Sequence, residues 1–277
     1  MNTLKSLTFT SCQAPNANDQ VRQILAYLGQ RLSLPIHFIE DADWRQRECA
    51  LDAGEINAGW ICGLPYVWKA DQPNPAIELL ATPVMAAPRY EDLPIYFSDV
   101  VVRNVSPYLS FQQLRGAAWA YNEPRSHSGY NLTRYHLSAV SPNQPFFSRV
   151  IKAGSHERAL RLILRGRVDA SAIDSTVLET ELANQPDLAS RLRVIEVLGP
   201  SPSPPWVVHK SPPAALRIEL RAVLLDMHAD PEGQQLLASH RLARFAAVTD
   251  HDYDLIRAME QAAKRVVFGA VVGFRGA

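Results

Sequence analysis

The sequence predicts an α/β protein made of two lobes, each with a mainly parallel sheet flanked by helices. Strand-like and helix-like patterns alternate along almost the whole chain, which is typical of layered α/β architecture. Two segments, 96–100 and 200–206, are suited to cross from one lobe to the other. The length of 277 residues is enough for one large domain or two ordinary ones.

With these two crossovers, residues 1–95 and 207–277 form the first lobe and residues 101–199 form the second. Two lobes joined by two strands make a hinged clamp. A cleft between such lobes is the usual place for a ligand, so we expect the binding site there.

The first strand–helix–strand unit lies within residues 4–40. A β-rich run at 4–12 is followed by a helical stripe that ends at Pro35, and a strand is expected at 36–40. The stripe consists of Val21, Ile24, Leu25, Leu28 and Leu32. A unit of this length predicts a parallel strand pair with a right-handed crossover.

The remaining elements are expected in the same alternating order. They are a helix and then a buried strand over 48–62, strands at 77–85, 95–103 and 116–122, a helix at 128–140, a helix and then a strand over 156–174, a strand at 191–199, and helices at 214–230, 231–240 and 250–267. Gly166 is a suitable C-terminal cap, and Asp250 or Asp252 a suitable N-terminal cap. The Pro-rich stretch 200–213 is expected to be an ordered connector, outside the centre of a sheet.

Composition excludes several classes of protein. Lys plus Arg equals Asp plus Glu at 28 each, so the basic excess typical of nucleic-acid binding is absent. No run approaches the roughly 18 apolar residues of a membrane span. Cys12, Cys49 and Cys62 lack the spacing of a disulfide framework or a zinc site. We predict neither a metal nor a cofactor.

The segment Asn122–Leu137, NEPRSHSGYNLTRYHL, contains the main candidate site. Ser126 falls near the start of a helix and Ser128 in its first turn, where backbone N–H groups lack helical partners. Two hydroxyls beside these groups suit an oxyanion, and Gly129 allows close approach. An ordinary helix cap is the alternative. The G-x-S-x-G pattern of a hydrolase nucleophile is absent around Ser128, so we assign no catalytic residue.

Two further residues fit a ligand site. His156 begins another helix and can donate to an anion, although Ser155 or His156 could equally serve as the cap. Asp174 ends a strand, at the edge where α/β sheets place ligand groups. Its carboxylate could accept a hydrogen bond from a protonated oxygen or an ammonium group.

Aromatic side chains gather near the expected cleft. Tyr66 follows a Gly-Leu-Pro turn, Tyr96 lies at the first crossover, and Trp206 ends the second. Such rings can stack on a ligand or surround a cation. Some must belong to the core instead, and we expect Trp68 there and Tyr66 in the site.

Several segments together resemble the substrate-binding proteins of phosphate, phosphonate and phosphite ABC transporters, which have the type 2 periplasmic-binding-protein fold. The similar segments are NAGWICGLPYV, YFSDVVVRNVSPYLSFQQLRGAAWAYNEPRSHSGY, VIKAGSHERALRLILRGRVDASAIDS and DPEGQQLLASHRLARFAAVTDHDYDLIR. The chain departs from the usual family pattern in having His127 where Thr is common, Ala58 where Asp is usual, and Asn122-Glu123-Pro124-Arg125 before the serines.

The resemblance implies a set of ligand-binding residues and, around it, a second shell. The ligand-binding residues would be Tyr66, Tyr96, Ser126, His127, Ser128, His156 and Asp174. The second shell would be Trp60, Tyr121 and Trp206. The implied function is non-catalytic capture of a small phosphonate-like or phosphate-like ligand for ABC transport, by a monomer that meets a permease.

The resemblance also implies the periplasm. The first ten residues contain no apolar segment of a signal peptide, so either the protein stays in the cytoplasm or a leader has been removed from this sequence. Two alternatives to transport also remain at this stage. One is an enzyme on the same clamp fold that uses His127 or His156 as acid or base. The other is a cytoplasmic ligand sensor.

Overall fold

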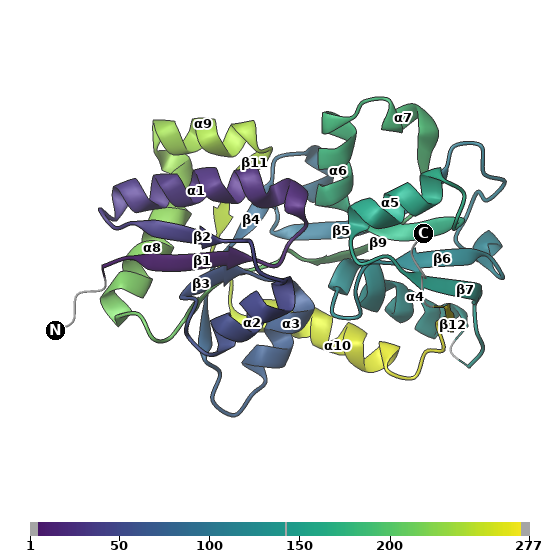
Figure 1. Ribbon diagram of the computed structural model, residues 1–277, viewed down its shortest axis with the longest axis horizontal. Coiled ribbons are helices and arrows are strands. Elements are labelled where there is room, and N and C mark those ends of the chain that lie inside the picture. The colour runs from purple at the N-terminus through teal and green to yellow at the C-terminus, as the bar shows by residue number, and fades with distance from the viewer. Residues whose placement is uncertain (1–4, 142, 273–277) are drawn as a thin grey trace. The chain divides into compact units, whose positions relative to one another are not determined.

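The chain folds into two compact units. The computed structural model describes residues 5–141 and 143–272 (Figure 1). Unit 1 consists of Met1–Ile95 and Pro202–Asp254, and unit 2 of Tyr96–Ser201 and Leu255–Ala277. We had expected the C-terminal residues 255–277 in the first lobe, but the described part of that segment, residues 255–272, groups by its contacts with unit 2. The lobe boundaries drawn from the sequence otherwise stay a prediction.

Unit 1 is built on a six-stranded mixed sheet of order β11-β4-β10-β3-β1-β2. Its elements are β1 (Leu7–Ser11), η1 (Pro15–Ala17), α1 (Asn18–Arg31), β2 (Ile36–Ile39), α2 (Trp44–Asp52), β3 (Ala58–Trp60), α3 (Gly63–Ala70), β4 (Ile77–Met85), η2 (Pro88–Tyr90), β10 (Trp206–His209), α8 (Ala214–Asp226), η5 (Met227–Ala229), α9 (Pro231–Ser239), β11 (Leu242–Ala246) and η6 (Asp250–Tyr253). Strand β1 pairs in parallel with β2 and β3, as expected for the crossover unit. Helices α1 and α2 therefore cover opposite faces of the sheet (Figure 1).

Strand β10 overturns one expectation. It lies in the middle of the sheet, antiparallel to both β3 and β4, although it belongs to the Pro-rich stretch that we placed outside sheet centres. The prolines stand before and after the strand, and Trp206–His209 itself contains none. These four residues therefore keep every N–H that a central strand needs.

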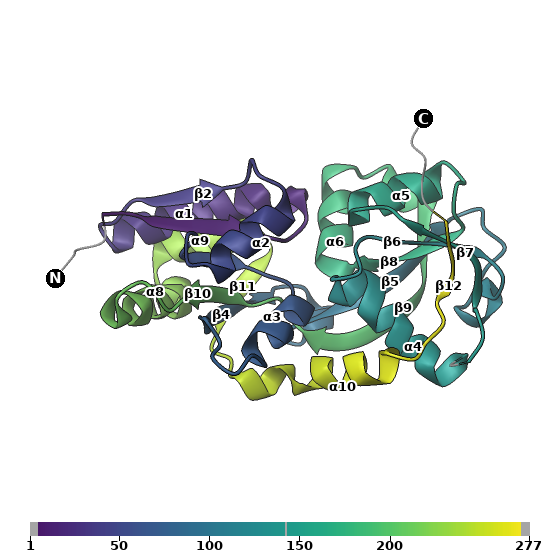
Figure 2. The same cartoon turned by 60° about the horizontal axis from the view of Figure 1, so that its bottom comes forward.

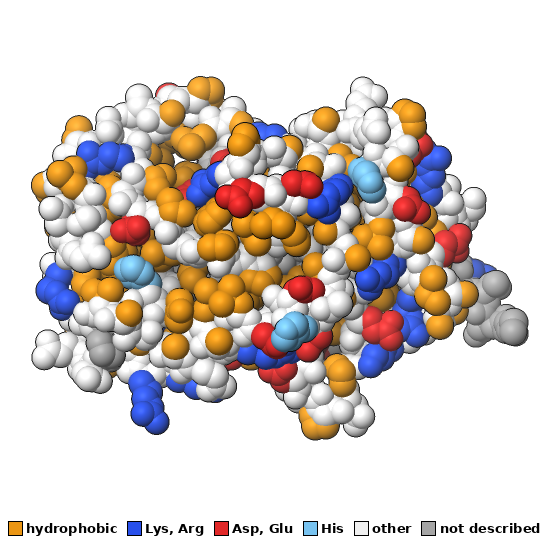
Figure 3. Space-filling view, turned by 180° about the vertical axis from the view of Figure 1, so that it is seen from behind, with side chains coloured by type: hydrophobic (Ala, Val, Ile, Leu, Met, Phe, Trp, Pro, Cys, Tyr) orange, Lys and Arg blue, Asp and Glu red, His pale blue; other side chains and the backbone are white. Residues whose placement is uncertain are grey.

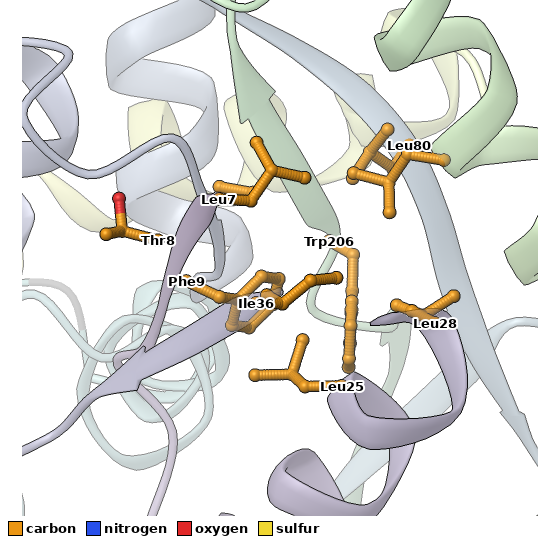
Figure 4. Close-up of a pocket in the computed structure, with 10 residues that line it drawn as sticks. Leu7, Thr8, Phe9, Leu25, Leu28, Ile36, Leu80 and Trp206 are labelled. Carbon is orange, nitrogen blue, oxygen red and sulfur yellow. The ribbon is translucent and has the colours of Figure 1, made fainter. Parts of the chain in front are cut away.

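Trp206 belongs to the core of unit 1. It is fully buried, and its ring centroid lies 4.6 Å from that of Phe9 and 5.3 Å from that of Phe245. The indole borders a void of about 10 Å³ (Figure 4). The other side chains labelled around this void are Leu7, Thr8, Phe9, Leu25, Leu28, Ile36 and Leu80. An apolar void of this size stays dry and leaves the surrounding packing nearly continuous.

Unit 2 contains a second six-stranded mixed sheet, of order β12-β7-β6-β8-β5-β9. Its elements are β5 (Ile95–Arg103), η3 (Gln112–Leu114), β6 (Ala118–Tyr121), η4 (His127–Asn131), α4 (Leu132–Val140), β7 (Phe147–Lys152), α5 (His156–Leu164), β8 (Ala170–Asp174), α6 (Ser175–Asn184), α7 (Leu188–Arg191), β9 (Leu192–Pro202), α10 (Asp254–Ala263) and β12 (Gly269–Val272). Strand β6 pairs in parallel with β7 and β8, and β5 pairs antiparallel to β8. Strand β12 runs parallel to β7 at the edge of this sheet (Figure 2), which explains why the C-terminal segment groups with unit 2.

The sheet of unit 2 is buried on both faces. Val100, Val102 and Trp119 belong to the core cluster on one face, whereas Val101 and Ala120 belong to the cluster on the other. Successive residues of a strand point to opposite faces, so a continuous apolar run such as Val100–Val102 supplies both cores.

Helix ends follow local chemistry. Gly166 has φ +63° just after α5, which confirms it as the C-terminal stop. Before α10, the cap is Thr249 rather than Asp250 or Asp252. Thr249 and Asp252 form a capping box at η6, in which the Asp252 carboxylate accepts from the Thr249 N–H at 2.7 Å.

The surface is mixed in charge. On the face shown in Figure 3, basic and acidic side chains are interspersed instead of forming a patch of one sign. In the described ranges, no helix combines the length and hydropathy that crossing a bilayer requires.

Candidate functional site

The predicted anion site lies at the turn that follows strand β6 in unit 2. Ser126 is the N-cap of η4, a single π-helical turn that continues into α4, and its Oγ accepts from the Gly129 N–H at 3.1 Å. The capping interpretation is thus correct for the Ser126 side chain. Ser126 and Ser128 are only 9% and 3% exposed, so the turn presents its polar groups in a largely enclosed environment.

Ser128 and His156 are brought together from different strand–helix turns. The Ser128 Oγ lies 3.2 Å from Nε2 of His156. His156 is free for this contact because the neighbouring Ser155 caps α5, accepting from the Arg158 N–H at 3.2 Å. Strands β6 and β7 are adjacent and parallel, so the turns after their C-terminal ends meet at one edge of the sheet.

Asn122 is the third member of this cluster. Its Nδ2 lies 3.1 Å from the same Nε2 of His156. A Cβ on Gly129 would overlap the Asn122 Oδ1 and approach the His156 ring at 3.0 Å. Glycine is therefore required here because the Asn122 amide lies directly against the backbone of the turn.

The side chain of His127 points into unit 2 and is fully buried. Asn131 Nδ2 lies 3.2 Å from Nδ1, and Ser201 Oγ lies 3.0 Å from Nε2. Because the amide nitrogen can only donate, Nδ1 accepts, and the proton on Nε2 is donated to Ser201. Both ring nitrogens are thus engaged by protein, and any contact from His127 to a ligand would come from its backbone.

Burial keeps both imidazoles neutral. It lowers the pKa of His127 from 6.5 to about 3 and that of His156 from 6.5 to about 4. Neither ring holds an extra proton at neutral pH. An oxyanion at this turn would therefore meet neutral hydroxyl, imidazole and backbone donors.

Asp174 ends strand β8 on the same sheet. Its Oδ1 accepts from the Thr176 N–H at 2.9 Å and from the Thr176 hydroxyl at 2.7 Å, so Asp174 caps α6. Burial raises its pKa from 3.8 to about 6, against the lowering effect of these hydrogen bonds, and the nearby Asp99 adds to the increase. In the β5–β8 ladder Asp174 pairs with Ser98, whose hydroxyl donates to the Ser128 carbonyl at 2.8 Å. Asp174 is thus connected, through Ser98 on strand β5, to the turn that contains Ser126 and Ser128.

The aromatic candidates divide between the units. In unit 2, the Tyr96 ring lies 6.4 Å from that of His127, and Tyr121 is buried against Tyr130 and Phe268. In unit 1, the Tyr66 hydroxyl donates to Asp250 at 2.8 Å, and its ring lies 4.6 Å from that of Tyr253.

The remaining aromatic candidates contact their own unit closely. Trp60 donates from Nε1 to the Pro204 carbonyl at 2.9 Å, and Trp206 is the core residue described above. Trp68, expected in the core, is only half-buried. The roles of Tyr66, Tyr96, Trp60, Tyr121 and Trp206 toward a ligand stay predictions.

Four polar residues of this region were not predicted from the sequence: Ser98, Asn122, Asn131 and Ser201. Asn131 could have been found from its spacing, since it lies four residues after His127 on the same turn. Ser98 lies on β5, Asn122 directly follows β6, and Ser201 lies on β9. Only the order of the strands brings these three residues to the turn that contains Ser126 and Ser128.

Among the described residues, no three His, Cys, Asp or Glu side chains are grouped so that they could hold a metal ion. The three cysteines are free, and burial raises the pKa of Cys12 to about 12, so its thiol is inert at neutral pH.

The sequence matches a family profile over most of its length. The profile is that of the ABC-transporter phosphonate periplasmic substrate-binding proteins, and the match covers residues 7–253. The chain belongs to this family. As a substrate-binding protein it is non-catalytic, as predicted, and the enzymatic alternative based on His127 or His156 is not supported.

Solved structures confirm the fold of this phosphonate-binding-family protein. A binding component of a phosphonate ABC transporter from Pseudomonas aeruginosa is 19% identical, with a TM-score of 0.82 over 95% of this chain and 87% of that one. A Prochlorococcus marinus protein solved with methylphosphonate is 18% identical, with a TM-score of 0.81 over 95% and 99% of the two chains. A Xanthomonas citri protein solved with ATP is 18% identical, with a TM-score of 0.73 over 95% and 98%. The type 2 periplasmic-binding-protein architecture is therefore shared. Both sheets are mixed: the sheet of unit 2 is mainly parallel, as expected, whereas the sheet of unit 1 contains three antiparallel pairings.

Proposed function

We propose that this substrate-binding protein holds the phosphonate oxygens of its ligand at the η4 turn of unit 2. The observation that carries the proposal is the buried contact between Ser128 and His156 beside the first N–H groups of the turn. Ser128 donates from its hydroxyl and its backbone amide, and His156 donates from its ring. The helix dipole adds a favourable potential for negative charge.

Asp174 gives the proposed site its preference among oxyanions. A buried carboxylate near the anion repels a fully ionised group but accepts a hydrogen bond from a protonated oxygen or an ammonium group. Phosphonates carry such a proton near neutral pH, whereas sulfate does not. We expect a phosphonate to bind in preference to sulfate for this reason. Tyr96, whose ring lies near that of His127, would add a further ligand contact within unit 2.

The protein partner would be the permease of the same transporter, met by a monomer of this chain. The family supports the permease as partner, because its members are described as substrate-binding proteins of ABC transporters. Size-exclusion chromatography with light scattering tests the monomer. A dimer at micromolar concentration would contradict it.

Calorimetric titration with methylphosphonate tests the site. We expect Ser128→Ala to weaken binding about tenfold or more, because a charge-assisted hydrogen bond contributes about 1.5–3 kcal/mol. Ser148→Ala, a change at an exposed serine of β7 in the same unit, is the matched control and should bind like the wild type. Equal affinities in the two variants would refute the assignment, and absence of any methylphosphonate binding by the wild type would refute that ligand class.

A further inference from the structure

Two hydrogen-bond donors converge on one ring nitrogen at the proposed site. Asn122 Nδ2 lies 3.1 Å and Ser128 Oγ lies 3.2 Å from Nε2 of His156. A neutral imidazole nitrogen without a proton has a single lone pair and accepts one good hydrogen bond. Only one of the two groups can therefore use it fully, and the amide nitrogen, unlike a hydroxyl, can only donate.

We propose that Asn122 is a positioning residue that holds the His156 proton on Nδ1 and frees the Ser128 hydroxyl to donate to a ligand oxygen. With the Asn122 amide donating to Nε2, that nitrogen carries no proton, and the neutral ring must carry it on Nδ1. The inference rests on the proposed function, because Ser128 and His156 act there as ligand donors.

Gly129 fixes which way the Asn122 amide faces. The oxygen end of the amide lies where a Cβ on Gly129 would be, so a hydrogen of the Gly129 methylene points at Oδ1. An oxygen accepts such a C–H contact weakly, whereas an NH₂ group in that place would bring hydrogen against hydrogen. The NH₂ end is therefore directed to His156.

The second ring nitrogen then becomes a donor. Nδ1 of His156 is buried and has no hydrogen-bond partner in the described structure. A proton held there is an unpaired N–H in a buried position, which favours the arrival of an acceptor oxygen. The opposite tautomer would leave Nδ1 an acceptor, unsuited to an anion. Asn122 thus determines whether His156 presents a donor or an acceptor.

Asparagine is the appropriate residue for this role because it is neutral. An aspartate at the same place would accept from Nε2–H, favour the imidazolium form and put a negative charge beside the proposed oxyanion. Asn122→Asp should therefore change both the ionisation of His156 and the affinity for an anion, although the two side chains have nearly the same shape.

Nuclear magnetic resonance of the ¹⁵N-labelled imidazole tests the inference without any ligand. In the wild type at pH 7.5 we expect a neutral His156 ring protonated on Nδ1. We expect Asn122→Ala to move the proton to Nε2 in a substantial fraction of molecules, and Asn122→Asp to raise the pKa of His156. Asn184→Ala, at an exposed position of the same unit, is the control and should leave the His156 signals unchanged.

Calorimetry with methylphosphonate supplies the second readout. Asn122→Ala and Asn122→Asp should each weaken binding by about tenfold, the effect of losing one good hydrogen bond. A wild-type ring protonated on Nε2, or an Asn122→Ala variant with unchanged tautomer and affinity, would overturn the inference. Failure of the wild type to bind methylphosphonate would instead remove the proposed ligand, and the NMR spectra would still decide the role of Asn122. If a variant does not fold, the position of the ring proton in wild-type His156 still tests the proposed role of Asn122.

Discussion

The hydroxyl of Ser98 donates a 2.8 Å hydrogen bond to the carbonyl oxygen of Ser128. Ser98 is fully buried in the middle of strand β5, and Ser128 lies in the first turn after β6. Strand β5 contributes no residue to the segment Ser126–Ser128, but its Ser98 side chain holds the backbone of that segment in place.

Ser98→Ala should lower the free energy of unfolding by about 1–2 kcal/mol, because the Ser128 carbonyl would lose a buried donor. Urea denaturation followed by circular dichroism measures this change, with Ser148→Ala as the exposed control. A stability equal to that of the control would mean that the Ser98 bond contributes nothing to the turn.

The stability of the protein should fall as the pH is lowered from 6.5 to 4. His127 and His156 have pKa values of about 3 and about 4 when folded, against 6.5 in the unfolded chain. The unfolded state takes up these protons first, so their contribution is complete above pH 6.5 and is lost as the pH falls. In the middle of that window each histidine lowers the unfolding free energy by roughly 1 kcal/mol per pH unit, and the slope is smaller near its two ends.

Asp174 should act in the opposite direction between pH 6 and 4. Its pKa is about 6 when folded against 3.8 unfolded, so the folded state takes up its proton first and gains stability as the pH falls. Asp174→Asn removes this compensation, and the variant should lose stability with falling pH more steeply than the wild type. Chemical denaturation at pH 6.0, 5.0 and 4.5 measures the two slopes, with Asp187→Asn at the surface as control. Parallel slopes would show that Asp174 is not protonated in this range.

His127 should contribute to stability more than to affinity. Its ring joins Asn131 on η4 to Ser201 on β9, both buried. We expect His127→Ala and Ser201→Ala each to cost about 1–3 kcal/mol, and the double variant to cost about 1 kcal/mol less than the sum. Additive losses would indicate that the two side chains do not interact, and a loss of methylphosphonate binding as large as that of Ser128→Ala would give the His127 ring a direct role.

Trp206→Ala should destabilise unit 1 by about 3–5 kcal/mol, because the truncation would enlarge the existing void beside Phe9 and remove the ring contact with Phe245. Methylphosphonate affinity of the folded variant should be unchanged if Trp206 acts only in the core. Calorimetric scanning and titration on the same sample separate the two effects. A weaker ligand affinity at normal stability would support the predicted place of Trp206 near the ligand.

Local patterns were sufficient to predict most elements of the fold. Strands 77–85 and 95–103 have the bounds expected from their apolar runs. Helix α3 was missed because Gly63 and Pro65 were interpreted as a turn. Pro65 lies in the first helical turn, where its missing N–H costs no hydrogen bond. Strand β10 was missed because the density of prolines around it outweighed the four residues between them.

The candidate site could be predicted only in part. Ser126, Ser128 and His156 follow from helix starts, which are local signals, and the structure brings Ser128 and His156 within hydrogen-bond distance. The Asn122 and Ser98 contacts depend on which strands become neighbours. That order is set by the packing of the whole sheet, and no short motif encodes it.

The central position of β10 also bears on how the chain is made. During synthesis β1, β3 and β4 emerge from the ribosome early, but the strand that joins β3 to β4 emerges only after nearly all of unit 2. Until then, the nascent polypeptide has two separate fragments of its first sheet with unpaired backbone edges. Completion of that sheet must therefore wait for the last third of translation.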